Sequence, residues 1–96
     1  MQIIAHEPLF WFFLQHENHF YLDVNCSNSF VGFDRLIQLS EEETKAYLEK
    51  GNAFLNEFAN DVQYYAQSNY ANRHIMGEIG DLVHEAIVEF NTKKSK

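Results

Sequence analysis

The chain has 96 residues, the size of one small domain, and residues 1–96 are treated as a single unit. Hydrophobic residues make up 46% and aromatic residues 16% of the chain, a composition that excludes intrinsic disorder. The net charge of −7 argues against binding to nucleic acid or to an anionic membrane. The single cysteine excludes a disulfide within the chain and fits a reducing compartment.

We expect no targeting signal in the N-terminal segment. Residues 1–7 lack the basic residues of a secretory signal peptide, and no stretch approaches the about 18 apolar residues of a membrane span. We therefore expect a cytoplasmic protein whose two ends, residues 1–7 and 92–96, are frayed.

The first part of the chain predicts a β-hairpin. Residues 9–14 form a continuous, aromatic-rich apolar run of the length of a buried strand. Residues 20–26 alternate with period two, which predicts a strand with one dry face. The residues of that dry face are Phe20, Leu22, Val24 and Cys26. We expect the turn around Glu17 and Asn18, with Asn18 taking a positive φ.

A third strand is expected after a second turn at residues 27–29. Residues 30–39 place apolar side chains on one face, but Arg35 interrupts that face. The neighbouring Asp34 is consistent with a bulge, and the pattern leaves this point open.

Two helices follow the strands. Ser40 and Glu43 have the spacing of a capping box, so a helix should begin at Ser40 and run to about residues 68–72. Gly51 falls on its apolar face, which suggests a close approach of the backbone to the sheet. A second apolar stripe, from Ile75 to Phe90, predicts the last helix. The order β-β-β-α-α predicts an α+β fold: a three-stranded antiparallel sheet followed by two helices packed on one face.

The first strand of this sheet has no polar face. With a two- or four-residue turn, Leu9, Trp11 and Phe13 join the core and Phe10, Phe12 and Leu14 point outward beside Tyr21; a three-residue turn exchanges the two sets. Either register leaves an apolar patch that the helices do not cover. The sequence thus predicts a homodimer whose interface is drawn from Phe10, Trp11, Phe12, Phe13, Leu14 and Tyr21. The alternative is that Ile3 and Ile4 fold back over part of the patch.

The motifs of common enzyme classes are absent. The chain has no glycine-rich phosphate loop, no cysteine pair for zinc and no glycine-flanked nucleophilic serine, so no catalytic residue and no cofactor are expected. If the turn has two residues, His16 and His19 face each other across the hairpin and are weak metal-ligand candidates, although a solvated turn is favoured. Cys26 should be a buried, small apolar residue.

Two further groups of residues suggest binding. A candidate ligand pocket consists of Tyr65, Tyr70, Arg73, His74 and His84, and the favoured interpretation of the tyrosines is an amphipathic rim around the core. An acidic helix face consists of Glu41, Glu42, Glu49, Glu57 and Asp61. That face is either simply solvated, or it binds a basic protein partner in the way that an antitoxin or immunity protein does.

Part of the chain resembles a known group of proteins. Val31-Gly32-Phe33, the segment Leu39-Ser40-Glu41-Glu42-Glu43, Tyr47, Gly51 and Phe54-Leu55 resemble small proteins encoded by mobile integron gene cassettes in bacteria. The resemblance implies a compact, cytoplasmic and often oligomeric protein, and it supplies no catalytic residues.

The sequence therefore favours a small bacterial accessory protein that acts as a homodimeric interaction module without catalysis. One alternative is a small-molecule binding protein, or a cofactorless enzyme, with an aromatic pocket between sheet and helices. The other is an acidic protein of the antitoxin or immunity type.

Overall fold

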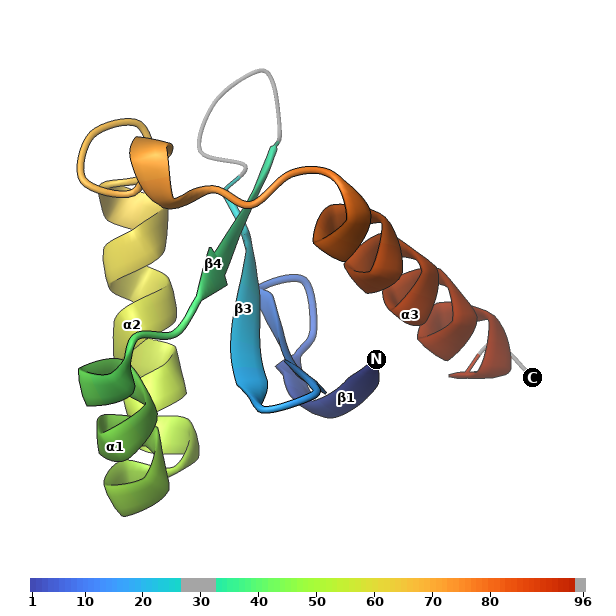
Figure 1. Cartoon of the computed structure of the whole chain (residues 1–96), viewed down its shortest axis with the longest axis horizontal. Coiled ribbons are helices and arrows are strands. Elements are labelled where there is room, and N and C mark those ends of the chain that lie inside the picture. The colour runs from blue at the N-terminus through green and yellow to red at the C-terminus, as the bar shows by residue number, and fades with distance from the viewer. Residues whose placement is uncertain (27–32, 95–96) are drawn as a thin grey trace.

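The structure, a computed structural model, describes residues 1–26 and 33–94. One antiparallel sheet has the strand order β1-β2-β3-β4 (Figure 1). The strands are β1 (Gln2–Glu7), β2 (Trp11–His16), β3 (His19–Asn25) and β4 (Asp34–Gln38). The helices are α1 (Glu41–Lys50), α2 (Asn52–Tyr64), the 3₁₀ turn η1 (Ala71–Arg73) and α3 (Glu78–Lys94). The α+β class with an antiparallel sheet is confirmed, and the sheet has four strands rather than three.

The β2–β3 hairpin has a two-residue turn, one of the alternatives that the sequence left open. His16 pairs with His19, so the register puts Trp11 opposite Val24 and Phe13 opposite Leu22. Glu17 rather than Asn18 takes the positive φ, of 56°. A turn that needs positive φ only at its first central residue explains this difference. The turn expected at residues 27–29, and residues 30–32 of the expected third strand, lie outside the described residues.

The N-terminal segment forms the strand that the sequence analysis missed. Residues 2–7, expected to fray, pair with β2 along its length, and the register shifts between Ile3 and Ala5. The neighbouring apolar Ile3 and Ile4, which do not alternate, concealed this strand because a bulge changes which face each residue occupies. Ile3 packs against the apolar cluster on one face of the sheet, whereas Ile4 is exposed, so only Ile3 contributes as the fold-back alternative expected.

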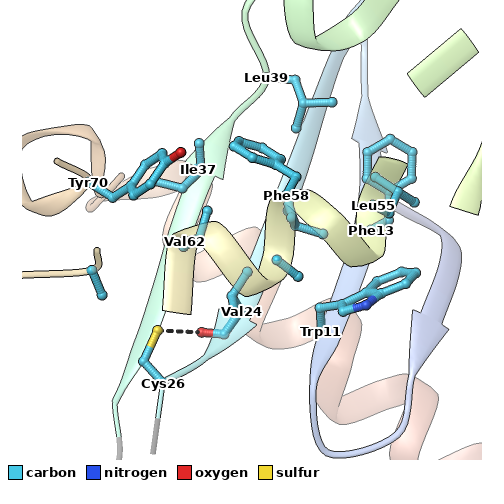
Figure 2. Packing of buried hydrophobic residues seen from close by; sticks show 13 residues of the cluster. Trp11, Phe13, Val24, Cys26, Ile37, Leu39, Leu55, Phe58, Val62 and Tyr70 are labelled. Atoms are coloured by element: carbon cyan, nitrogen blue, oxygen red, sulfur yellow. Dashed lines mark hydrogen bonds between the residues drawn. The ribbon is translucent and has the colours of Figure 1, made fainter. Parts of the chain in front are cut away.

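The helices occupy both faces of the sheet, and the expectation of two helices on one face is wrong (Figure 1). On the first face, α2 packs against alternate residues of the strands, and Figure 2 shows this cluster. Its fully buried members include Trp11, Phe13, Leu22, Val24, Ile37, Leu55 and Val62. On the second face, α3 contributes Val83 to a cluster with Leu14, Tyr21 and Leu36 of the sheet.

The helix expected from Ser40 onward is broken at Gly51. The capping box is confirmed, since Glu43 N donates to Ser40 Oγ at 3.2 Å and Ser40 N donates to Glu43 Oε1 at 2.8 Å. Gly51 has φ 64° and ψ −138°, which ends α1 and begins α2, and the two helices lie side by side (Figure 1). A Cβ at Gly51 would meet nothing within 4 Å. The expected close approach to the sheet is therefore wrong, and the backbone conformation explains the glycine.

A short segment carries the chain from the first face to the second. Arg73 Nη2 donates to the carbonyl of Gln38 at 3.0 Å, and Ile75 N donates to the carbonyl of Leu36 at 2.9 Å. The amide of Leu36 donates to His74 Nδ1 at 3.0 Å. These contacts cover the outer edge of β4, whose backbone groups would otherwise be unpaired. Among the described residues, no helix is long and apolar enough to cross a membrane.

Candidate functional site

The space between the sheet and α3 contains two adjoining hollows. Their volumes are about 320 Å³ and 360 Å³, and Asp23, Asp34 and Ile87 line both. The first hollow extends toward β1 and the C-terminal part of α3, where His6, Phe12 and Phe90 line it. The second extends toward His74 and the start of α3. Each volume is at the lower end of the roughly 300–1,000 Å³ typical of small-molecule sites.

Two carboxyl groups lie where the hollows meet. Asp23 belongs to β3 and pairs with Leu36, and Asp34 begins β4 opposite Asn25, two pairs further along. Because alternate residues of a strand share a face, both side chains lie on the α3 side. Asp23 is only 8% exposed. Its burial, and then the nearby Asp34 carboxylate together with a hydrogen bond between the two, raises the pKa of Asp23 to about 7.

Asp23 is the group of this pair that holds a proton toward neutral pH. Asp23 is buried whereas Asp34 is exposed, so loss of solvation and the neighbouring carboxylate both disfavour the ionised form of Asp23. A carboxyl group that titrates near pH 7 can donate or accept a hydrogen bond, or exchange its proton for a bound cation.

Three rings form the wall of the first hollow. The ring centroids of His6 and Phe12 are 5.6 Å apart, those of His6 and Phe90 are 4.9 Å apart, and those of Phe12 and Phe90 are 5.7 Å apart. The rings come from β1, β2 and α3, so the sheet and the helix build this wall together. The side chain of Trp11 lies on the opposite face, where its Nε1 donates to Asn56 Oδ1 at 3.0 Å.

A strained turn borders the same hollow. Pro8 and Leu9 are the central residues of the turn that joins β1 to β2, closed by Phe10 N donating to the Glu7 carbonyl at 3.0 Å. Leu9 has φ 64°, and 93% of its surface is exposed. Glycine or asparagine normally occupies such a position, so a leucine here is unfavourable both in backbone conformation and in exposure.

The second hollow has both polar and apolar walls. His74, Asp81 and His84 line it, together with the glycines at the start of α3. His74 Nδ1 accepts from the amide of Leu36, and burial, followed by the charge of Arg35, lowers the pKa of His74. The imidazole is therefore neutral at physiological pH, with Nε2 carrying the hydrogen.

The structure separates the ligand-pocket residues predicted from sequence. His74 and His84 line the second hollow, but Tyr65 lies outside both hollows and is 39% exposed. Tyr70 is buried in the first-face cluster, and its hydroxyl donates to Asp61 Oδ2. Arg73 donates to both carboxylate oxygens of Glu43, at 2.7 and 2.9 Å. Tyr70 and Arg73 thus hold η1 against α1 and α2.

The residues predicted for a dimer interface are covered within one chain. Trp11 and Phe13 are buried beneath α2, and Leu14 and Tyr21 are buried on the α3 side. Phe10 and Phe12 are half-buried and line the first hollow. The expectation of an uncovered apolar face is wrong, because α3 and Ile3 lie over it. The homodimer itself stays a prediction, and it would need another surface.

The remaining candidates from the sequence are His16, His19 and Cys26. His16 Nε2 lies 3.8 Å from Glu17 Oε1, and Gln38 Nε2 donates to His19 Nδ1 at 3.2 Å. Within the described part of the chain, no three His, Cys, Asp or Glu side chains are grouped to hold a metal ion. Cys26 is buried as predicted, and its burial raises the pKa of the thiol.

The carboxyl pair was not predicted from the sequence, because the polar odd positions of β3 suit a face exposed to solvent. One signal was present: the stripe from Ile75 to Phe90 is long enough to cover a sheet face by itself. Placing that helix opposite the first one would have put Asp23 beneath it. The alternation of side chains along β4 would then have placed Asp34 on the same face of the sheet.

Comparisons with protein-family models, with curated proteins and with solved structures found no match to this chain. The resemblance to integron cassette proteins stays an expectation, and the function is argued from the site.

Proposed function

We propose that this protein binds a small organic molecule in the hollow between the sheet and α3. The observation that carries the proposal is a cavity of about 320 Å³ with an aromatic wall and with a carboxyl group, Asp23, at its base. An apolar cavity with a few convergent polar groups is the usual form of a small-molecule site.

The contrast with the rest of the core supports this proposal. Among the described residues, Asp23 is the one buried polar or charged side chain, and it lies on the second face. Burying a carboxyl costs free energy unless it is well paired, and the Asp23–Asp34 pair pushes the pKa of Asp23 upward instead. A pair of this kind provides a ligand with strong hydrogen-bond partners.

A filled-cavity variant tests the proposal. Ile87 lines both hollows, so Ile87→Trp should fill the space where they meet. Val88 follows it on α3 and is 49% exposed, so Val88→Trp adds the same ring outside the hollow. The wild type and the Val88 variant should bind members of a library of small amphipathic molecules, with amide NMR shifts at Phe12, Asp23 and Phe90. The Ile87 variant should lose these shifts and remain folded.

Two results would contradict the proposal. One is a library that leaves the amide signals around the hollow unmoved in the wild type. The other is unchanged binding in Ile87→Trp, which would place the ligand elsewhere on the protein.

The other functions expected from the sequence stay predictions. The homodimeric interaction module no longer has the uncovered face on which it rested, and sedimentation velocity at micromolar concentration measures whether the chain associates. For the immunity-type function, the acidic residues Glu41, Glu42, Glu49, Glu57 and Asp61 are all exposed and open to a basic partner.

A further inference from the structure

Apart from the histidines, the charged side chains that line the two hollows are acidic. Asp23, Asp34 and Asp81 line them, and within residues 1–26 and 33–93 no lysine or arginine does. The histidines are His6, His74 and His84. With a net charge of −7 for the whole chain, the potential inside the hollow favours a cation.

The mouth of the first hollow favours an apolar body. His6, Phe12 and Phe90 provide ring surface, and Leu9 exposes 93% of its area at the rim while holding φ 64°. Strained residues at a rim are maintained by the surrounding fold and concentrate at ligand sites. A molecule that covers Leu9 removes apolar surface from water, which contributes to its binding.

We infer that the molecule bound in this hollow is an amphipathic organic amine, with its ammonium group at the Asp23–Asp34 pair and its aromatic or aliphatic body against Phe12, Phe90 and Leu9. This inference rests on the proposed function and adds the chemical class of the ligand. An ammonium group donates up to three hydrogen bonds, which matches two adjacent carboxyl groups.

The binding step exchanges one cation for another. Below about pH 7 the pair holds one proton, and the incoming ammonium group replaces it as the hydrogen-bond donor between the carboxylates. The released proton goes to solvent, no bond of the ligand is broken, and nothing is oxidised or reduced. The affinity for an amine should therefore rise about tenfold per pH unit toward pH 7 and level off above it.

Other titrating groups face the pair and enter the same measurement. They are His6 on β1, His74 before α3, and Asp81 and His84 on α3. Protonated histidines repel an ammonium group, so their titration changes the affinity in the same direction. The contribution of the pair is isolated by a substitution at Asp23.

The experiment uses matched pairs of amines and alcohols with the whole chain. The probes are phenethylamine with 2-phenylethanol, tryptamine with indole-3-ethanol, and hexylamine with hexanol, each titrated by calorimetry and NMR between pH 5.5 and 8.5. At pH 8 we expect at least one amine to bind roughly 10- to 100-fold more tightly than its alcohol, which is the usual range for a hydrogen bond to a charged group. Binding at pH 6 should release about one proton, measured in buffers of different ionisation enthalpy.

Two variants locate the effect. Asp23→Asn should reduce amine affinity by the same roughly 10- to 100-fold, leave the alcohols within about threefold, and abolish the proton release that belongs to the pair. Glu85→Gln makes the same change of charge on an exposed position of α3 and should leave both affinities unchanged.

The outcomes separate this inference from the proposed function. If alcohols or other neutral molecules bind in the hollow and no amine exceeds its alcohol, the amine assignment is overturned and the binding function stands. If amines bind equally well to wild type and Asp23→Asn, the ammonium group does not lie at the pair and the assignment is also overturned. If nothing shifts the signals of Phe12, Asp23 and Phe90, both proposals fail.

Discussion

The two faces of one sheet are packed very differently in this protein. On the first face, α2 has 13 residues and buries Leu55, Phe58, Ala59 and Val62. On the second face, α3 has 17 residues, and among residues 78–93 only Val83 is buried. The longer helix thus covers its face without filling it. The hollow and its carboxyl pair lie under the loosely packed helix, and the well-packed face holds the sheet in place beneath them.

This difference suggests a division of roles. A densely packed face provides stability, because each buried side chain contributes transfer free energy and contacts. A helix that leaves a cavity gives up part of that stability, and it leaves room for a ligand. Substitutions on the two faces should therefore differ in kind as well as in size.

The largest effect is expected from Phe13→Ala. Phe13 is fully buried on the first face, so its truncation should lower the free energy of unfolding by about 3–5 kcal/mol. Phe12 is the preceding residue on the same strand, points to the second face and is half-buried at the hollow. Phe12→Ala should cost only about 1–2 kcal/mol, because much of its surface already borders a cavity. Urea denaturation of the two variants measures both values, and equal losses would mean that the faces are packed alike.

The second prediction concerns the pH dependence of stability. The pKa of Asp23 is raised from 3.8 to about 7, so its favourable contribution is complete below about pH 4 and is lost as the pH rises to 7. Asp23→Asn removes this loss. The variant should gain stability over the wild type as pH rises from 4 to 8, by at most about 4 kcal/mol.

Chemical denaturation at pH 4, 6 and 8 checks this prediction. The comparison is the difference between variant and wild type at each pH, because His74, whose pKa is lowered, changes stability in the opposite direction in both proteins. A difference that does not change with pH would show that the pair is well solvated, and would remove the electrostatic distinction between the two faces.

The sequence predicted the first face better than the second. Alternation in residues 20–26 predicted which residues of β3 pack against α2, and the capping box located the start of α1. These are local signals, each contained within a few residues. The class of fold followed from them. The turn length, and with it the inward face of β2, was left open by the sequence.

The second face depended on information that is not local. Nothing in the apolar stripe of α3 states which side of the sheet it covers, and residues 2–7 pair with β2 through a bulge that obscures their alternation. Asp23 is buried because a helix from the other end of the chain crosses above it. Arg73 was predicted to line a ligand pocket, yet it forms an ion pair with Glu43, which lies 30 residues away in the sequence.

Gly51 gives the third prediction. Its φ of 64° and ψ of −138° lie in a region that almost only glycine adopts, and a methyl group at this position would meet no atom within 4 Å. Gly51→Ala and Gly51→Leu should therefore both lower the free energy of unfolding by about 1–3 kcal/mol, and by similar amounts.

Gly80, at the start of α3, has no positive φ, and its Cβ would make only an ordinary contact, 3.7 Å from the Ile75 carbonyl oxygen. Gly80→Ala should therefore raise stability by about 0.4–1 kcal/mol. Thermal melts of the three variants test this, and a much larger loss for leucine than for alanine at Gly51 would restore the close approach to the sheet.

A small loss of stability is expected from Ser40→Ala, on the first face. The variant loses the side-chain acceptor for the amide of Glu43, and such a loss costs about 1 kcal/mol. Ser40→Asp keeps an acceptor at the same place and should remain within a few tenths of a kcal/mol of the wild type. Because the cap is remote from the hollow, the NMR signals of Phe12, Asp23 and Phe90 should not move in either variant. Shifted signals there would show that the cap at Ser40 is coupled, through Glu43 and Arg73, to the segment that leads into α3, and the two faces would then be one cooperative unit.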